Sequence, residues 1–254
     1  MFTNGLQTMC QKKKYIFERK KRMKTAIVTG ASSGIGFAIS KTLVTLGYRV
    51  YGIGRDFSKV CIESDYFIPM VCDIMDMSYL CKKITEIKKK EKVYLLINSA
   101  GVGYFGPHEE LNPKKIHEMV VTNLEVPLVL TQLLLRDLKN NKGFIINISS
   151  VTAKQSCTHG CVYGATKAGL THFSNNLFDE TRKYGVKVIT IHPDITKSNF
   201  YRNADFQEGD IPESYIIPEE IAQAVEMVLK QREGIIMTDI TIKPQKHRIV
   251  RKSK

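Results

Sequence analysis

Tyr163 and Lys167 are two side chains whose types and spacing suit proton transfer, in the segment Tyr163-Gly164-Ala165-Thr166-Lys167. On a helix, residues four apart share one face. A free phenol has a pKa of about 10, too high for a base at neutral pH, but a nearby ammonium favours the phenolate. We therefore expect Lys167 to lower the pKa of Tyr163, and Tyr163 to act as an acid/base.

Two hydroxyl groups come shortly before this pair, in the segment Asn147-Ile148-Ser149-Ser150. If a strand ends at this point, Ser150 can polarise a substrate oxygen beside Tyr163. A Tyr-x-x-x-Lys pair alone is common on exposed helix faces. Its place after two hydroxyls favours acid/base chemistry on an alcohol or a carbonyl.

A glycine-rich turn follows the first predicted strand, in the segment Thr29-Gly30-Ala31-Ser32-Ser33-Gly34-Ile35-Gly36. Gly30 permits the tight turn, Gly34 lets backbone N–H groups approach a pyrophosphate, and Gly36 lets helix and strand pack closely. The following helix begins with its partial positive charge at this point. The segment predicts a dinucleotide site, and Lys167 can donate to the ribose hydroxyls beside a nicotinamide ring.

The second predicted strand ends in Tyr51-Gly52-Ile53-Gly54-Arg55, about 20 residues after the last glycine of the turn. An acid here would accept from the ribose 2′-hydroxyl of NAD, but Gly54 stands where the acid is expected. Arg55 can bind a 2′-phosphate through charge-assisted hydrogen bonds. NADP is therefore preferred over NAD, and the alternative for Arg55 is a solvated loop cation.

The next two predicted strands end at Cys72-Asp73-Ile74 and at Asn98-Ser99-Ala100-Gly101. In a parallel sheet the carboxyl ends of the strands form the ligand crevice. Asp73 can accept from the adenine amine, and Asn98 can hold the backbone near the adenine ribose. Either residue alone would read as a turn former.

Apolar periodicity alternates along the chain between short β-branched runs and longer helical patterns, which is typical of a parallel sheet with crossover helices on both faces. The predicted strands are Thr25–Val28, Arg49–Ile53, Tyr66–Val71, Val93–Ile97, Gly143–Ile148, Val186–Ile191 and Gly234–Ile240. The predicted helices are Ile35–Leu46, Met77–Lys90, Pro113–Leu138, Tyr163–Tyr184 and Pro218–Gln231.

The chain of 254 residues suits one α/β domain, which we place at 23–254. Residues 1–22 hold seven Lys or Arg against one Glu, a net +6 of the total +13. We interpret them as a basic extension, either disordered or the product of an upstream start codon, since no apolar core follows the charges. The segment 197–217 has no clear periodicity and is expected to be a functional loop.

Composition argues for a globular protein without a metal site. Hydrophobic residues make up 43% of the chain, and no apolar run approaches the roughly 18 to 20 residues of a membrane span. The six cysteines form no C-x-x-C pair and lack zinc-finger spacing, so neither a metal nor a disulfide framework is indicated. Reduced thiols in a cytoplasm are the expected state.

Taken together, these motifs resemble the short-chain dehydrogenase/reductase family over nearly all of 24–244. The resemblance implies a Rossmann-type doubly wound fold, a seven-stranded mostly parallel sheet in a three-layer αβα sandwich. It implies that Ser150 stabilises the substrate oxygen, Tyr163 exchanges its proton, Lys167 tunes Tyr163, and Asn123 holds a water linking Lys167 to solvent. It also implies a homodimer or homotetramer.

The residues expected to contact the cofactor are spread over the strand ends. They are Gly30, Ser32, Ser33, Gly34, Ile35, Gly36, Arg55, Asp73, Ile74, Asn98, Ala100, Gly101, Tyr163, Lys167, Pro193, Thr196 and Ser198. The chain departs from the family pattern at Ser99, which replaces an Asn, at Asp194, which replaces a Gly, and at Ser198, which replaces a Thr. Asp194 is expected to add charge near the nicotinamide and to restrict its loop.

The predicted reaction interconverts a secondary alcohol and a ketone by hydride transfer. The resemblance places the substrate pocket at Gly103, Tyr104, Phe105, Thr152, Cys157, His159 and 199–215. A small 3-hydroxy acid and a hydroxysteroid or bile acid both remain possible substrates. The alternative from another class is a non-catalytic nucleotide-sensing or nucleic-acid-binding protein, prompted by the basic charge; Tyr163 and Lys167 argue against it.

Overall fold

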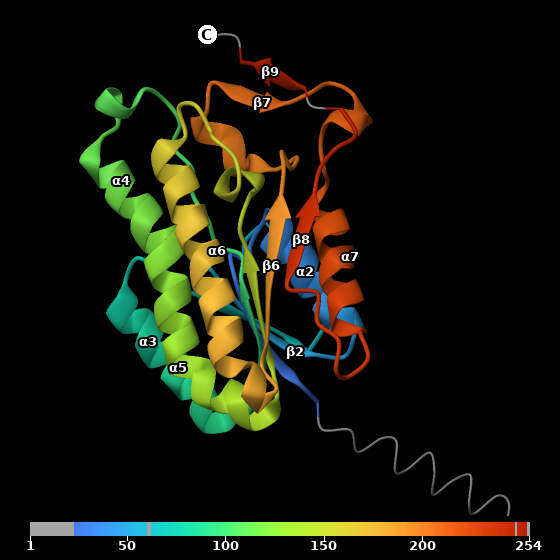
Figure 1. Ribbon diagram of the computed structural model, residues 1–254. Coiled ribbons are helices and arrows are strands. Elements are labelled where there is room, and N and C mark those ends of the chain that lie inside the picture. The colour runs from blue at the N-terminus through green and yellow to red at the C-terminus, as the bar shows by residue number, and fades with distance from the viewer. Residues whose placement is uncertain (1–22, 60–61, 247, 253–254) are drawn as a thin grey trace, which may run out of the picture.

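A computed structural model describes residues 23–59, 62–246 and 248–252, so the predicted basic extension lies outside the described residues. The described residues form a seven-stranded sheet in the order β3-β2-β1-β4-β5-β6-β8, with every neighbouring pair parallel. The strand order reverses between β1 and β4, which is the switch point of a doubly wound sheet. The predicted fold class is confirmed (Figure 1).

The predicted elements occur in the predicted order, and most bounds agree within two residues. The strands of the large sheet are β1 Thr25–Thr29, β2 Arg49–Gly54, β3 Phe67–Val71, β4 Val93–Asn98, β5 Phe144–Ile148, β6 Lys187–Pro193 and β8 Asp239–Ile242. The helices are α2 Gly34–Thr45, α3 Met77–Lys90, α4 Pro113–Val120, α5 Val126–Asn141, α6 Cys161–Thr181 and α7 Pro218–Leu229. Short 3-10 turns lie at His108–Glu110, Val151–Ala153, Arg182–Tyr184, Asn199–Asn203 and Pro212–Ser214.

Helices cover both faces of the sheet. Figure 1 shows α3, α4, α5 and α6 on one side, and α2 beside α7 on the other. Side chains alternate along β1, so Ala26 and Val28 pack toward Ile39 of α2 while Ile27 packs toward Leu80 of α3. A strand buried on both faces needs apolar residues at every position, which explains the continuous apolar run of β1.

The predicted last strand, Gly234–Ile240, is wrong in its bounds, because β8 begins only at Asp239. Gly234 has a left-handed φ of 85°, and Ile236 and Met237 pack against the core as part of a connecting segment. The apolar residues of this run pack against the core but do not pair as a strand. The ladder with β6 starts where the Thr190 N–H donates to the Thr238 carbonyl.

The segment 197–217, predicted as a loop, contains a strand. β7 (Phe206–Glu208) pairs antiparallel with β9 (Ile249–Arg251), which comes from the basic end of the chain. Lys252 reinforces this pairing, since its N–H donates to the Asp205 carbonyl at 2.7 Å and its Nζ to the Tyr201 carbonyl at 2.6 Å. The end of the described chain therefore holds the segment after β6 in place.

The predicted helix from Pro113 to Leu138 is interrupted by a π-helical turn at Val121–Glu125, between α4 and α5. Among the described residues, Pro113–Asn141 is the helical stretch long and apolar enough to cross a membrane by length and composition. Half of its apolar window is buried against the rest of the molecule. Leu130, Leu134 and Leu138 belong to the core, and this packing accounts for the apolar character.

Candidate active site

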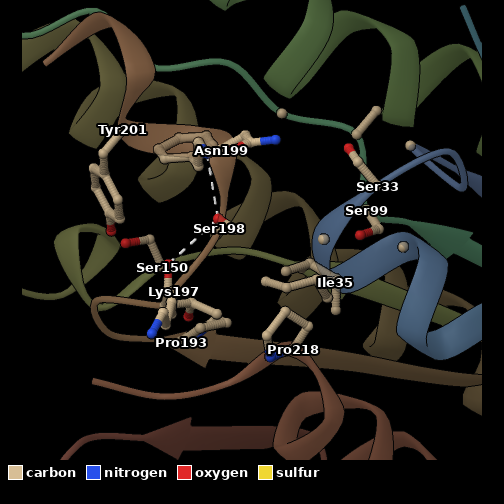
Figure 2. Close-up of a pocket in the computed structure, with 18 of the residues that line it drawn as sticks. Ser33, Ile35, Ser99, Ser150, Pro193, Lys197, Ser198, Asn199, Tyr201 and Pro218 are labelled. Atoms are coloured by element: carbon tan, nitrogen blue, oxygen red, sulfur yellow. Dashed lines mark hydrogen bonds between the residues drawn. The ribbon is translucent and has the colours of Figure 1, made fainter. Parts of the chain in front are cut away.

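A cavity of about 400 Å³ opens at the carboxyl ends of β1, β4, β5 and β6. It lies at the switch point of the sheet, where ligands of doubly wound folds bind. Figure 2 shows Ser33, the N-cap residue of α2, and Ile35 from the first turn of α2 on one side, and Ser198 and Asn199 from the segment after β6 on the other.

The glycine turn forms the floor of this cavity because its backbone packs without side chains. Gly30 has a φ of +70°, and a Cβ there would lie 2.9 Å from the Cα of Ala100. A Cβ on Gly36 would lie 2.3 Å from the Gly30 carbonyl oxygen. Thr29 fixes the facing strand end, since its hydroxyl oxygen accepts from the N–H of Ser99 at 3.1 Å and of Ala100 at 3.0 Å. The N–H groups that begin α2 are thereby left to face an anion.

At the end of β2, Gly54 occupies the position where an acid would favour NAD over NADP, and the structure leaves no room for an acidic side chain there. A Cβ on Gly54 would lie 2.7 Å from the Oγ of Ser32, so a carboxylate does not fit there without displacing Ser32. The carboxylate of the next acid, Asp56, accepts from the N–H of Ser58 at 2.7 Å and from its hydroxyl at 3.0 Å. Arg55 is exposed beside them.

Most of the predicted cofactor residues line the cavity. They are Gly30, Ser33, Gly34, Ile35, Gly36, Ala100, Gly101, Tyr163, Lys167, Pro193, Thr196 and Ser198. Ser32, Arg55, Asp73, Ile74 and Asn98 do not line it. Ser32 and Arg55 lie at or beside the end of β2, and the exposed Asp73 caps its own turn by accepting from the Met75 N–H at 3.0 Å.

Asn98 has a different place from the predicted one, because its side chain is buried inside the sheet. Its Nδ2 donates to Asn147 Oδ1 at 2.7 Å, and Asn147 in turn donates to Ser174 Oγ at 2.8 Å. These bonds tie β4 to β5 and to α6. Asn98 thus positions the strand ends and does not face the cavity.

Several lining residues were missed from the sequence, among them Ser99, Ile148, Lys197 and Pro218. Ser99 is the informative one, since its Oγ is buried without a hydrogen-bond partner among the described residues. A buried hydroxyl without a partner is costly. A polar ligand in the cavity would satisfy it, so the residues present fit a nucleotide.

Lys167 is buried at the centre of the site. Its Nζ donates to the Ile148 carbonyl at 2.8 Å, and the Ser149 hydroxyl donates to the Lys167 carbonyl at 3.1 Å. The Nζ also lies 3.6 Å from the place of a Cβ on Gly101. Burial lowers the pKa of Lys167 to about 8. An ammonium has three N–H donors, so Lys167 can bind hydroxyl groups in the cavity while holding β5.

The pKa of Tyr163 shifts in the direction opposite to the prediction. Its ring is 7% exposed, and burial raises the pKa of Tyr163 well above its ordinary value, with the Ser150 hydroxyl opposing that shift. Lys167 Nζ lies 5.8 Å from the ring centroid and does not offset the desolvation. Burial disfavours the charged phenolate. Burial therefore favours the neutral phenol of Tyr163.

Ser150 caps the short turn after β5 and leaves its hydroxyl proton available. The Thr152 N–H donates to Ser150 Oγ at 3.2 Å. A hydroxyl that accepts one bond still has one proton to donate. Ser150 and Tyr163 both line the cavity, so it has two hydroxyl groups in its lining at this end.

Asn123 lies in the π-helical turn between α4 and α5 and is fully buried. Its amide accepts from the Val102 N–H and donates to the Val102 carbonyl, each at 2.9 Å, and also donates to Thr166 Oγ1 at 3.1 Å. π-helical turns often mark functional sites. This side chain clamps the segment after β4 onto α6; the predicted water contact stays a prediction.

The carboxylate of Asp194 accepts a hydrogen bond from the backbone of its own loop. Oδ1 accepts from the Ile195 N–H at 2.8 Å, and the Asp194 N–H donates to the Ile242 carbonyl at 2.9 Å. The loop continues with Ser198, whose Oγ accepts from the Phe200 N–H at 3.3 Å. Asp194 lines the cavity, as the sequence predicted, and it restricts the loop through these bonds.

A second cavity, of about 440 Å³, adjoins the first and shares Ser150, Tyr163, Asp194 and Tyr201 with it. Predicted pocket residues Phe105, Thr152, Cys157 and His159 line it. The far wall was not predicted, because β9 supplies it through Ile249 and Arg251.

Aromatic rings narrow the space beside Tyr163. The ring of Phe105 lies 5.5 Å from Tyr163 and 5.2 Å from Phe206, and that of Phe200 lies 5.5 Å from Tyr163, between centroids. Such tilted pairs pack favourably. Phe105 and Phe206 line the second cavity beside Tyr163.

Comparisons with known proteins agree with this geometry. A probable NADP-dependent dehydrogenase of Haemophilus influenzae is 30% identical over 234 residues, covering 87% of this chain and 93% of the relative. An NADP-dependent 3-hydroxy acid dehydrogenase of Schizosaccharomyces pombe is 27% identical over 241 residues, covering 87% and 92%. The structure of an alcohol dehydrogenase from Thermococcus sibiricus superposes with a TM-score of 0.81 at 24% identity, covering 89% of this chain and 99% of the other.

The family model for short chain dehydrogenases matches residues 24–209, which include the glycine turn, Asn123, Ser150, Tyr163 and Lys167. That range takes in most of the chain, and the sheet order and the strand-end cavity fit the same assignment. The chain therefore belongs to the short-chain dehydrogenase family of oxidoreductases.

Proposed function

We propose that this protein is an NADP(H)-dependent oxidoreductase that interconverts a secondary alcohol and a ketone, with Tyr163 as its acid/base. The observation that carries the proposal is the meeting of the two cavities at Ser150 and Tyr163. A nucleotide in the first cavity and a substrate in the second would share that boundary. Lys167 lines the first cavity next to this boundary, and Asp194 and Tyr201 are the other described residues that line both cavities.

The chain's own residues perform the proton steps. A nicotinamide nucleotide held by the residues of the first cavity would supply or take the hydride. Ser150 donates a hydrogen bond to the substrate oxygen, and Tyr163 gives its proton to that oxygen as the carbonyl is reduced. Lys167 binds ribose hydroxyls and holds β5 through Ile148. The neutral state of Tyr163 suits carbonyl reduction, in which the phenol must carry a proton.

The phosphorylated cofactor is favoured by the end of β2. Ser32 fills the space where a carboxylate would stand, Asp56 is bonded to Ser58, and Arg55 is the available cation. Two relatives carry NADP-dependent names, which supports the same choice. The cytoplasmic location and the homodimer or homotetramer stay predictions.

Replacing Arg55 by Asp tests the cofactor assignment. We expect the ratio of kcat/KM with NADPH to kcat/KM with NADH to fall about 100-fold, because a favourable charge pair becomes a repulsive one, worth about 3 kcal/mol. The effect of Arg55→Asp on this ratio should be smaller at high salt, which screens the charges. The matched control is Arg232→Asp, an exposed cation that does not line either cavity, which should leave the ratio unchanged. An unchanged ratio in Arg55→Asp would show that another group binds the phosphate.

For the substrate we propose a small hydroxy acid and its oxo acid. Arg251 lines the second cavity on the wall formed by β9, with Ser150 and Tyr163 among the residues of the same cavity. A guanidinium binds a carboxylate through two parallel hydrogen bonds. The Schizosaccharomyces pombe relative acts on 3-hydroxy acids by its name, which supports this choice.

Replacing Arg251 by Met tests the substrate class. We expect kcat/KM for a 3-oxo acid to fall about 10- to 100-fold, the loss of one charge-assisted contact, while the methyl ester of the same acid keeps its rate. An assay of NADPH absorbance against 3-oxo acids, ketosteroids and small diketones gives the comparison. A ketosteroid as the best substrate, or an equal loss for acid and ester, would contradict the assignment. No turnover with any carbonyl would favour the non-catalytic alternative.

A further inference from the structure

His192 lies in β6, next to the segment that carries Ser150, and its side chain is fully buried. Nδ1 lies 3.1 Å from the Ser150 carbonyl oxygen, and Nε2 lies 3.0 Å from Asp239 Oδ2. His192 belongs to none of the motifs identified in the sequence. Neither His192 nor Asp239 lines the two cavities, so the pair does not touch the proposed cofactor or substrate.

Both partners of the imidazole are hydrogen-bond acceptors. A backbone carbonyl can only accept, and the oxygens of the Asp239 carboxylate accept as well. A neutral imidazole has one N–H, so it can donate to one of the two partners at a time. The ring makes both bonds only with a proton on each nitrogen.

When the ring holds one proton, the two acceptors compete for it. A hydrogen bond to a carboxylate is stronger than one to a neutral carbonyl, so the proton goes to Nε2 and to Asp239. The lone pair on Nδ1 then faces the Ser150 carbonyl, which is repulsive. The Ser150 carbonyl keeps its other bond, from the Ala153 N–H at 3.1 Å.

We propose that His192 is a positioning residue for Ser150, which it holds through Nδ1–H only while the ring carries a second proton. This inference rests on the proposed function, because it concerns the hydroxyl that polarises the substrate oxygen. Neighbouring backbone groups are held separately, Ile148 by Lys167 and Ser149 by the Ile191 carbonyl. His192 supplies the corresponding contact for Ser150.

Two charged side chains act on the ring. Asp239 from β8 favours its protonation, and Lys154, which follows the turn Val151–Ala153, opposes it. Lys154 forms an ion pair with Asp239 and donates to Thr241 Oγ1 at 3.0 Å. Burial is the largest influence and lowers the pKa of His192 below its ordinary value, with the bonds to Ser150 and Asp239 opposing burial.

The sign of the pH effect follows from this direction. Because the pKa of His192 is below its usual value, the second proton is lost as pH rises through the mildly acidic range. The contact with Ser150 is present at the acid end of that range and absent above it. We therefore expect kcat for carbonyl reduction by the wild-type enzyme to fall about 3- to 10-fold as the pH rises from acid values toward about 6.5, the ordinary imidazole pKa, and to stay low above it.

The test compares three variants over that range in the NADPH assay. His192→Phe removes both donors and should lower kcat about 10-fold at pH 5, with the Kd of NADPH unchanged. His192→Asn keeps an N–H near the place of Nδ1 and should restore most of kcat with a flat pH profile. Asp239→Asn should also flatten the profile at the high value, since its amide can donate to Nε2 and so keep the proton on Nδ1.

The control is Thr190→Val, a substitution of similar size on the same strand. Thr190 is 1% exposed, and its hydroxyl has no partner among the described residues. It should keep the wild-type kcat and pH profile. Asp239 is partly exposed, so Asp239→Asn remains informative if the buried substitutions fail to fold.

Two results would overturn the inference. One is a wild-type profile that is unchanged in His192→Asn and Asp239→Asn, and the other is full kcat in a folded His192→Phe. Ser150→Ala separates this failure from that of the proposed function. If Ser150→Ala loses activity and the His192 variants do not, only the role of His192 is wrong; if Ser150→Ala keeps full activity, the proposed role of Ser150 is wrong as well.

Discussion

Tyr163→Phe should lower kcat for carbonyl reduction about 1000-fold, within the range by which a positioned acid or base accelerates proton transfer. The substitution removes one oxygen and keeps the ring, which packs against Phe105 and Phe200. The Kd of NADPH should therefore change little. Fluorescence titration with NADPH, followed by single-turnover kinetics, separates binding from chemistry.

The control for this change is Tyr48→Phe, because Tyr48 is a second buried tyrosine. It is 8% exposed, and burial raises the pKa of Tyr48 to about 12. It comes immediately before β2, at the end of the sheet opposite the cavities, and should keep the wild-type rate. A Tyr163→Phe enzyme with more than a tenth of the wild-type kcat would refute the assignment of Tyr163 as the acid.

The sequence predicted the sheet well, because the strands of its centre are buried on both faces and read as continuous apolar runs. The same rule misled at Gly234–Ile240, where an apolar run is buried without pairing to a neighbour. β9 could not be predicted, since Ile249–Arg251 is three residues long in a basic tail and its partner lies about 40 residues earlier. Arg251 was missed with it.

In the site, sequence spacing identified the side chains that belong to local motifs, but it could not predict how deeply the fold buries them. Tyr163 and Lys167 share a helix face as predicted, yet burial decides both pKa values, and burial depends on the packing of distant elements. His192 was missed for a similar reason. A lone histidine in a strand is usually a core residue, and only the fold brings Ser150 and Asp239 to its two nitrogens.

The second large effect is expected from Lys167→Met, which should reduce kcat/KM about 100-fold or more and also stabilise the cofactor-free protein. Activity falls because ribose binding and the contact with Ile148 are lost. Stability rises because the buried ammonium is costly: its pKa of about 8 is well below the ordinary 10.5. That difference corresponds to about 3 kcal/mol, and the lost hydrogen bond offsets about 1 kcal/mol of it.

The pH dependence of stability separates this explanation from a general packing effect. Between about pH 8 and pH 10.4 the unfolded chain binds a proton at Lys167 that the folded chain has released, so wild-type stability rises with pH relative to Lys167→Met. The advantage of Lys167→Met is therefore largest below pH 8, where a Tm higher by about 4 °C is expected, and it narrows toward pH 10. Thermal unfolding without NADPH at pH 7 and pH 9.5 measures both. A Met variant less stable than wild type at pH 7 would show that the buried ammonium is held by compensating contacts, and that Lys167 is retained for stability as well as for chemistry.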